Sequence, residues 1–325
     1  TVPAGWVVFS NSITPAPQKD QDAWTYDFEP SEKISSYITA IVAGPYKGVT
    51  DQLTSSDGRT IPLGVYCRAS LEEHLDADRI IDVTKQGFGF YEKMYNRPYP
   101  FTKYDQIFVP EYNAGAMENA GCITFRDQYL FRTPPTRAQL GTRANTILHE
   151  LAHMWFGDLV TMKWWNDLWL NESFAEFMSH QCSAEATEYE DAWTAFGSRK
   201  AWGTTQDQLP STHPIAAEIN DLNDIEVNFD GITYAKGAAV LRQLVAYVGR
   251  ENFEKGLHAY FDEHAWGNTE LADLLSKLSE ASGRDLDEWA KVWLQEAGIT
   301  LLRTSVSTDE DGTIRDLSNV QELPM

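Results

Sequence analysis

Apolar side chains recur at three- and four-residue steps through the middle of the chain, which is the spacing of amphipathic helices. One such stripe consists of Ala144, Ile147, Leu148, Leu151, Ala152, Trp155, Phe156 and Leu159. A second stripe runs from Leu170 to Cys182 with the same spacing. The pattern predicts helices over these two stretches and over residues 75–95, 232–248, 253–261, 271–279 and 286–295.

Shorter apolar runs with partial alternation predict strands at residues 61–68, 106–109 and 122–125. Similar strand-type sequence, interrupted by Pro and Gly, occupies residues 1–60, and a further strand-rich pattern starts at Ile299. A sheet followed by helices predicts the α+β class. The 325 residues are enough for about two domains.

The first helical stripe carries the string His149-Glu150-Leu151-Ala152-His153. Histidines at i and i+4 stand on one face of a helix, where two imidazole nitrogens can hold one zinc ion. The glutamate between them can act as a general base. The alternative is a solvated helix with two incidental histidines, because motifs this short recur by chance.

A catalytic zinc site needs a third protein ligand and an open position. Glu172 opens the second helical stripe and follows His153 after eighteen intervening residues. That gap allows the first helix to end, turn and send a second helix back, so that the Glu172 carboxylate would face both histidines. Taken alone, Glu172 is better explained as a first-turn glutamate that interacts favourably with the helix dipole.

Two more motifs stand in order around these helices. Residues 115–119 are Gly115, Ala116, Met117, Glu118 and Asn119, and residues 234–237 are Tyr234, Ala235, Lys236 and Gly237. Together with 149–153 and 171–173, they make the chain resemble the gluzincin zinc aminopeptidases of the aminopeptidase N family, whose exopeptidase signature is Gly-Ala-Met-Glu-Asn. The resemblance covers residues 66–298. The amino-acid sequences at 113–115 and 153–157 resemble those of bacterial members of the family.

The resemblance implies a thermolysin-like catalytic domain, a mixed sheet followed by helices, over residues 61–298. Residues 1–60 would then be the last strands of an N-terminal β-domain, and residues 299–325 the start of a following β-sandwich. We therefore expect a fragment centred on the catalytic domain, without the long helical C-terminal domain of the family.

The resemblance also implies roles for the motif residues. His149, His153 and Glu172 would hold one Zn²⁺ per chain, and Glu150 would accept the proton of the attacking water. The Tyr234 hydroxyl would stabilise the oxyanion of the tetrahedral intermediate. Without the family, a tyrosine on a helix is better explained by packing.

Glu118 would explain why such an enzyme acts on chain ends. A carboxylate near the metal, but not bound to it, can hold the free α-ammonium of a peptide by charge-assisted hydrogen bonds. The small residues Gly115 and Ala116 would let this loop run beside the peptide as an edge strand. Ala114 and Phe229 are candidates for lining the first side-chain pocket. The alternative for Glu118 is a loop carboxylate that caps backbone amides.

Charge and cysteine content limit the remaining classes. The net charge of −22 argues against nucleic acid as a partner, which calls for a basic surface. Three widely spaced cysteines without a CxxC pair argue against a disulfide framework and favour the cytoplasm. No apolar run approaches the ~18 residues of a membrane span. The start of the chain does not resemble a signal peptide, and we expect a monomer.

The sequence thus predicts a zinc aminopeptidase that releases N-terminal residues from peptides. In the family, the N-terminal β-domain supplies a second polar side chain to the substrate ammonium, and residues 1–60 contain no recognisable equivalent. We therefore expect zinc binding with low peptidase activity from this chain alone. The alternatives are a non-catalytic zinc-binding fragment, a zinc endopeptidase and a bifunctional epoxide hydrolase. The spacing leaves open whether the Asp167 carboxylate accepts a hydrogen bond from one of the zinc-binding histidines.

Overall fold

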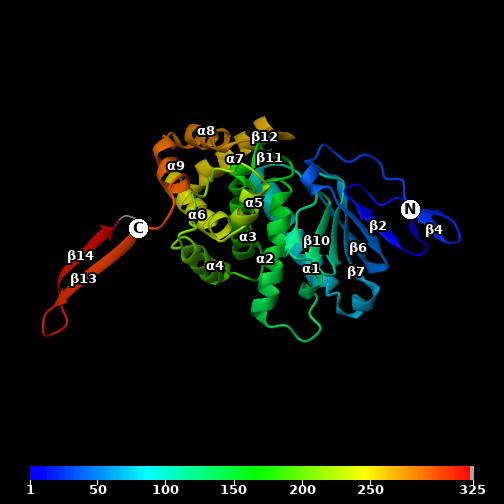
Figure 1. Cartoon of the computed structure of the whole chain (residues 1–325), viewed down its shortest axis with the longest axis horizontal. Coiled ribbons are helices and arrows are strands. Elements are labelled where there is room, and N and C mark those ends of the chain that lie inside the picture. The colour runs from blue at the N-terminus through cyan, green and yellow to red at the C-terminus, as the bar shows by residue number, and fades with distance from the viewer. Residues whose placement is uncertain (323–325) are drawn as a thin grey trace.

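The computed structural model describes residues 1–322 and has a sheet-rich half, a helical half and a projecting C-terminal hairpin (Figure 1). The strands are β1 (Val2–Pro3), β2 (Val7–Ser10), β3 (Gln18–Lys19), β4 (Ala23–Thr25), β5 (Ile41–Gly44), β6 (Tyr46–Thr54), β7 (Thr60–Arg68), β8 (Tyr104–Val109), β9 (Ala116–Met117), β10 (Cys122–Arg126), β11 (Val160–Met162), β12 (Gly267–Thr269), β13 (Leu301–Thr308) and β14 (Ile314–Glu322).

Most of the helices follow the sheet in the chain. The α-helices are α1 (Ala77–Tyr95), α2 (Arg137–His153), α3 (Trp169–Ala186), α4 (Ala192–Gln206), α5 (Leu222–Asn228), α6 (Gly237–Val248), α7 (Arg250–His264), α8 (Leu271–Ser282) and α9 (Asp287–Leu294). Four short 3₁₀ turns are η1 (Ser36–Ile38), η2 (Ala69–His74), η3 (Asp127–Tyr129) and η4 (Trp165–Asp167), and η5 (Ile232–Lys236) is a π-helical turn. This arrangement has the predicted α+β character.

Five strands form the main sheet in the order β6-β7-β8-β10-β9. The three middle strands run parallel, while β6 and β9 pair antiparallel at the two edges. All of β8 except Val109 is buried, as expected for a parallel strand covered on both faces. β9 is an edge strand, so one side of its backbone has no strand partner within residues 1–322. The hairpin β6–β7 crosses residue 60, where the sequence predicted the boundary between the N-terminal β-domain and the catalytic domain.

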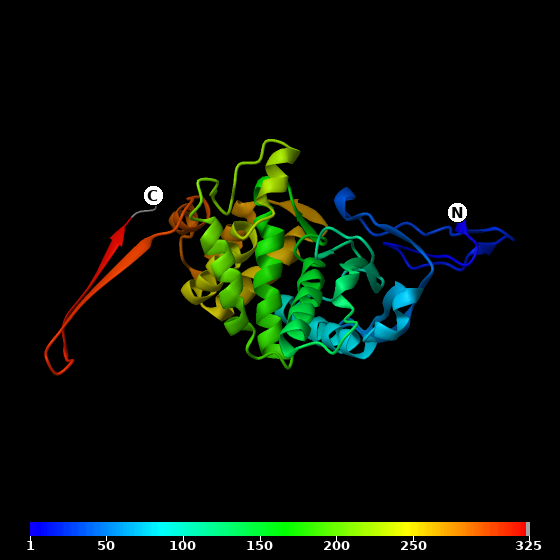
Figure 2. The same ribbon diagram turned by 60° about the horizontal axis from the view of Figure 1, so that its bottom comes forward.

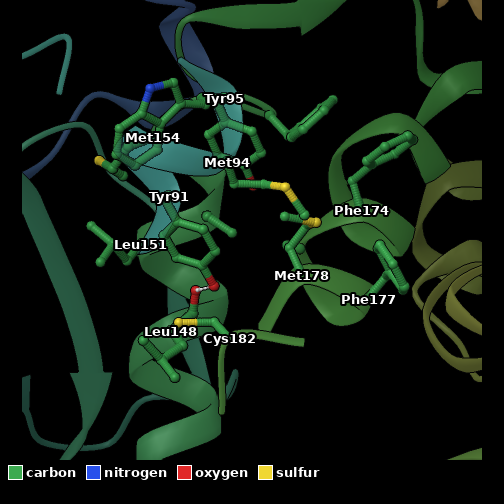
Figure 3. Close-up of a cluster of buried hydrophobic side chains, with 14 of the residues drawn as sticks. Tyr91, Met94, Tyr95, Leu148, Leu151, Met154, Phe174, Phe177, Met178 and Cys182 are labelled. Atoms are coloured by element: carbon green, nitrogen blue, oxygen red, sulfur yellow. Dashed lines mark hydrogen bonds between the residues drawn. The ribbon is translucent and has the colours of Figure 1, made fainter. Parts of the chain in front are cut away.

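Helix α1 contacts β6 and β7 as well as α2 and α3, so it joins the sheet to the helical half. Figure 3 shows side chains of these three helices packed together: Tyr91, Met94 and Tyr95 from α1, Leu148 and Leu151 from α2, Met154 just after it, and Phe174, Phe177, Met178 and Cys182 from α3. The Tyr91 hydroxyl donates to the Leu148 carbonyl at 2.8 Å. Gly87 lets α1 approach α2, because a Cβ there would meet Leu148 and Leu151 at 2.5 and 2.7 Å.

The first predicted helix is shorter than its apolar spacing indicated. α2 ends at His153, whereas we predicted helix up to Leu159. The N–H groups of Asp158 and Leu159 donate to carbonyls five residues back, which closes the helix in a wider turn. Gly157 adopts φ +131° in that turn, a conformation that other residues rarely adopt. The helical spacing extends further because Trp155, Phe156 and Leu159 are also core residues.

The N-terminal strands and the hairpin β13–β14 lie at opposite ends of the molecule (Figures 1 and 2). The first 44 residues form a three-stranded sheet, β1-β4-β3, and the separate pair β2–β5. The hairpin β13–β14 extends away from the helices, and all of its strand residues are exposed. The last three residues of the β-sandwich predicted at 299–325 lie outside the described residues.

Cys67, Cys122 and Cys182 are buried and unpaired, in agreement with the predicted lack of a disulfide framework. Within residues 1–322, none of the helices combines the length and the apolar character that crossing a membrane requires.

Candidate active site

His149 and His153 lie near the C-terminal end of α2, one turn apart on the same face. The helix begins with a capping box, in which the Gln139 N–H donates to the Thr136 hydroxyl and the Thr136 N–H donates to the Gln139 side chain. Both histidines are buried, and their Nε2 atoms lie 3.1 Å apart. The helix therefore presents two imidazole nitrogens to one point.

Glu172 lies in the first turn of α3, which packs along α2. Its Oε2 atom lies 3.3 Å from Nε2 of His149 and 3.4 Å from Nε2 of His153. Two imidazoles and a carboxylate that converge in this way are a donor set that suits a divalent transition metal. The structure thus brings together the three residues that the sequence predicted as ligands.

The charges around this cluster favour a bound cation. Burial opposes ionisation of Glu172, but the His153 charge and hydrogen bonds from both histidines hold the Glu172 pKa below its usual value. Burial raises the pKa of Glu150 well above its usual value. The His153 charge lowers this pKa, while the Glu118 and Glu172 charges raise it further. Burial would lower the pKa of His153, yet the charges of Glu118 and Glu172 raise it well above its usual value. Three carboxyl groups, those of Glu118, Glu150 and Glu172, therefore surround His153 and favour a positive charge at this point, which a metal ion would also supply.

The outer nitrogens of the two histidines also face oxygen atoms, although only that of His153 lies within hydrogen-bond distance of one. Nδ1 of His153 lies 3.0 Å from the Phe156 carbonyl oxygen, which the turn after α2 brings into place. Nδ1 of His149 lies 3.7 Å from Oε2 of Glu176, and Arg199 donates to both Glu176 oxygens at 2.7 and 3.1 Å. Such acceptors orient metal-binding histidines. The sequence analysis missed Glu176, although its position four residues after Glu172 on the same helix was a usable signal.

Asp167 does not support a histidine. Its carboxylate accepts hydrogen bonds from the Trp169 indole at 3.2 Å and from the Leu271 N–H at 3.3 Å. It therefore joins the start of α3 to the start of α8. The possibility that the sequence left open for Asp167 is wrong, because the 3₁₀ turn η4 directs this side chain toward α8 and Trp169.

The turn after α2 also explains why Gly157 stands there. A Cβ at Gly157 would lie 3.3 Å from Nδ1 of His153 and 3.2 Å from Nδ2 of Asn171. A larger residue would therefore press on the ring of His153. The backbone conformation and the close approach both require glycine at this position.

Glu118 follows the edge strand β9 and is buried. Its Oε1 atom accepts a hydrogen bond from the Tyr37 hydroxyl at 3.2 Å, and Tyr37 in turn accepts one from the Asn171 side chain at 3.0 Å. Ligand atoms of Glu118, Glu150 and His153 lie within 4.8 Å of one another. The structure therefore places Glu118 beside the histidine cluster, and it adds Tyr37, which the sequence analysis missed.

Tyr234 lies in the π-helical turn η5 that leads into α6. Its ring stacks on His149, with centroids 5.9 Å apart and an interplanar angle of 18°. Burial raises the pKa of the Tyr234 hydroxyl well above its usual value, and the Glu172 charge adds to this, so the hydroxyl stays a hydrogen-bond donor. Asp230 holds the turn, because its carboxylate accepts from the N–H groups of Ile232 and Thr233. Single-turn π segments of this kind are frequent at functional sites.

A cavity of about 970 Å³ opens next to the cluster. His149, Glu150 and Tyr234 line its inner end, together with Ala114 and Phe229, the two residues considered for the first side-chain pocket. Within residues 1–322, the Glu150 Oε2 atom is buried without a hydrogen-bond partner. The cavity is large enough for more than one amino-acid residue, and it exposes the motif residues to a ligand.

Comparisons with known proteins agree with this arrangement. A family model described as the Peptidase family M1 domain matches residues 79–293. The chain is 58% identical to aminopeptidase N of Streptomyces lividans over 325 residues, which is 99% of this chain and 37% of the relative. It is 35% identical to leucyl aminopeptidase of Saccharolobus solfataricus over 309 residues, covering 94% of this chain and 38% of the relative.

A plant relative shows the same pattern. The chain is 34% identical to aminopeptidase M1 of Arabidopsis thaliana over 307 residues, covering 94% of this chain and 34% of the relative. The chain therefore spans little more than a third of the length of these curated relatives.

Proposed function

The chain belongs to peptidase family M1, and from this premise we propose that it forms the catalytic part of a zinc-dependent aminopeptidase. The proposed reaction is hydrolysis of the first peptide bond of a peptide with a free N-terminus. The observation that carries the proposal is the convergence of the three donor atoms of His149, His153 and Glu172 beside Glu150, Glu118 and Tyr234.

His149, His153 and Glu172 are the proposed ligands of one zinc ion per chain. When bound, zinc would polarise the scissile carbonyl and acidify the attacking water. The convergence of the ligand atoms and the excess of carboxylates around them support this assignment. The Arg199–Glu176 pair would hold the ring of His149, and the Phe156 carbonyl would hold that of His153.

Glu150 is the proposed general base. It takes a proton from the water that attacks the scissile carbonyl carbon, and it delivers that proton to the leaving amine as the C–N bond breaks. The Glu150 Oε2 atom, which has no hydrogen-bond partner within residues 1–322, supports this role because it can accept a proton, and Glu150 lines the cavity in which a substrate would lie. The Tyr234 hydroxyl donates a hydrogen bond to the oxyanion that forms on the carbonyl oxygen.

Glu118 is the proposed recognition group for the substrate ammonium. The pairing of a buried carboxylate with an ammonium fixes the first peptide bond over the ligand cluster. Gly115, Ala116, Met117 and Asn119 complete the segment around it, and the edge position of β9 supports pairing of this backbone with the peptide. A blocked terminus would leave the buried Glu118 carboxylate without a cationic partner, at a cost of about 1–3 kcal/mol.

The finer architectural predictions belong to the same proposal. We propose a thermolysin-like catalytic domain over residues 61–298, between a partial β-domain at 1–60 and the start of a β-sandwich at 299–325. The mixed sheet and the helices α1, α2 and α3, which contact one another, support this domain assignment. A cytoplasmic location and a monomeric state stay predictions.

The test combines metal analysis with a reporter assay, on this chain and on the longest form of the protein that contains it. We expect one zinc per chain and hydrolysis of aminoacyl amides with a free amine, with little hydrolysis of their acetylated counterparts. Equal cleavage of acetylated peptides would point to an endopeptidase. Zinc binding without turnover in both forms would point to a non-catalytic zinc-binding protein.

A further inference from the structure

Tyr37 lies in the N-terminal part of the chain, and its hydroxyl makes a hydrogen bond to Glu118. It lies in the 3₁₀ turn η1, more than eighty residues before Glu118 in the sequence. Nothing in the sequence around it forms a motif with the zinc-site residues. Its position at the cluster is therefore a product of the tertiary structure alone.

The turn that carries Tyr37 is firmly held. Ile38 next to it is completely buried in the main core, and the Tyr37 ring packs edge-to-face on Trp165 at 5.4 Å. The buried Asn11 side chain donates to the carbonyl of Ile38 at 2.9 Å and to the carbonyl of Ala120 at 3.0 Å. Asn11 thus fastens the turn η1 to the segment that directly follows Glu118.

The hydrogen bonds of the Tyr37 hydroxyl have a defined direction. An ionised carboxylate can only accept, so the Tyr37 hydroxyl must donate its single proton to Oε1 of Glu118 at 3.2 Å. The Tyr37 oxygen is then free to accept, and the Asn171 amide donates to it at 3.0 Å. Asn171 directly precedes Glu172, so this chain of hydrogen bonds ties Glu118 to the segment that carries a proposed metal ligand.

A tyrosine suits this position better than a basic residue would. A lysine or arginine beside Glu118 would neutralise the carboxylate and compete with the substrate ammonium. A phenol fixes the orientation of the carboxylate and leaves its charge available. Burial raises the Tyr37 pKa well above its usual value, and the Glu118 charge adds to this, so the hydroxyl keeps its proton. The Tyr37 hydrogen bond engages Oε1 of Glu118 and not Oε2, so the phenol leaves the second oxygen for a ligand.

We propose that Tyr37 is a positioning residue of the amino-end site: its hydroxyl sets the Glu118 carboxylate in the orientation that receives the substrate ammonium. The N-terminal segment thereby contributes to the choice of free amino ends, although it has no recognisable ammonium-binding motif. This inference rests on the proposed function, because it assumes that Glu118 binds the ammonium.

The test uses the zinc-loaded protein and the variant Tyr37→Phe, which keeps the ring and removes the hydroxyl. The probes are a leucine hydroxamate with a free amine and its N-acetyl counterpart, since both reach the metal but only the first presents an ammonium. We expect about 10-fold weaker inhibition by the free-amine probe, in line with the loss of a hydrogen bond to a charged group. Inhibition by the acetylated probe should change less than about 2-fold.

The matched control is Tyr26→Phe in the same N-terminal segment, whose hydroxyl donates to the Trp6 carbonyl at 2.8 Å in an exposed position. This variant should leave both inhibition constants unchanged. Zinc content should stay at the wild-type value in Tyr37→Phe, and the thermal midpoint should fall by no more than a few degrees, because the contact with Trp165 is kept while two hydrogen bonds are lost. A loss of zinc, or equal weakening of both probes, would make Tyr37 a structural residue and overturn the proposal.

A double-mutant cycle separates positioning from direct contact. In a Glu118→Ala background, Tyr37→Phe should have no further effect on the ratio of the two inhibition constants. A persisting effect would mean that Tyr37 touches the ammonium itself and would overturn the positioning role. If wild-type protein fails to prefer the free-amine probe, the proposed role of Glu118 fails. If it prefers that probe and Tyr37→Phe does so equally, only the Tyr37 inference fails.

Discussion

The three proposed metal ligands lie on the long helices α2 and α3. In contrast, Glu118 directly follows a two-residue edge strand, Tyr37 lies in a 3₁₀ turn and Tyr234 lies in a π-helical turn. The helical ligands need only the spacing within α2 and one helix–helix contact to converge. The groups proposed to contact or orient the substrate depend on the sheet, the N-terminal segment and the approach to α6. The difference separates two functions, because changes in the helices should affect the metal while changes in the other group should affect rate and selectivity.

The largest effect should follow from Glu172→Ala. It removes the only ligand supplied by α3, and we expect zinc affinity to fall by more than about 100-fold, since changes outside the ligand set alone reach 10- to 100-fold. Hydrolysis should disappear with the metal. Zinc competition with a chelator measures this, and Glu185→Ala on the same helix, which loses contacts with Arg250 and Gln181 away from the cluster, is the control. Full zinc retention would remove Glu172 from the ligand set.

Glu150→Gln should separate metal binding from chemistry within α2. The amide cannot accept and return the proton, so turnover should fall by about 10²- to 10⁴-fold with one zinc still bound. Elemental analysis beside a steady-state assay measures both quantities. A variant that loses its zinc would make Glu150 part of the structure of the metal site instead.

Tyr234→Phe should lower turnover by about 100- to 1000-fold, the usual effect of one lost oxyanion donor, with zinc unchanged. Tyr247→Phe is the control, because that tyrosine lies at the exposed end of the following helix α6. Near-normal turnover of Tyr234→Phe would reduce its ring to a packing partner of His149.

Glu118→Ala should act on selectivity more than on metal. We expect the preference for free over acetylated substrates to fall by about 10- to 100-fold, because the carboxylate that pairs with the ammonium is gone. The measurement compares kcat/KM for the two forms of one peptide. An unchanged preference would assign the choice of amino ends to another group.

The smallest effect concerns the support of the Tyr234 turn. His213 contacts Asp230 at 2.9 Å; burial would lower the His213 pKa, but the Asp230 hydrogen bond and charge raise it above its usual value. A raised folded-state pKa means that this contact stabilises the protein fully below the unfolded pKa of about 6.5, and that the stabilisation fades as the pH rises through the folded pKa. Urea unfolding should therefore show a larger stability gap between wild type and His213→Gln at pH 6 than at pH 9. A constant gap would show that the imidazole charge does not contribute.

The sequence predicted the α+β class, most of the helices and three strands of the main sheet, β7, β8 and β10, because their apolar spacing reflects burial directly. It failed at the end of α2, since Trp155, Phe156 and Leu159 kept a helical spacing while packing from a turn. It did not anticipate α4 and α5, which bring Arg199 to Glu176 and support the approach to η5. The hairpin β13–β14 shows the opposite case, in which strands form although none of their residues is buried.

The sequence by itself determined the pair of histidines, because the backbone hydrogen bonds of a helix place residues four apart on one face whatever surrounds them. It also indicated the distant carboxylate and the Gly-Ala-Met-Glu-Asn segment. Only the tertiary structure decided that Tyr37 meets Glu118 and that Arg199 and Glu176 stand behind His149. These contacts join residues far apart in the chain. They exist only because the sheet, α1, α2 and α3 pack in one arrangement that no local pattern encodes.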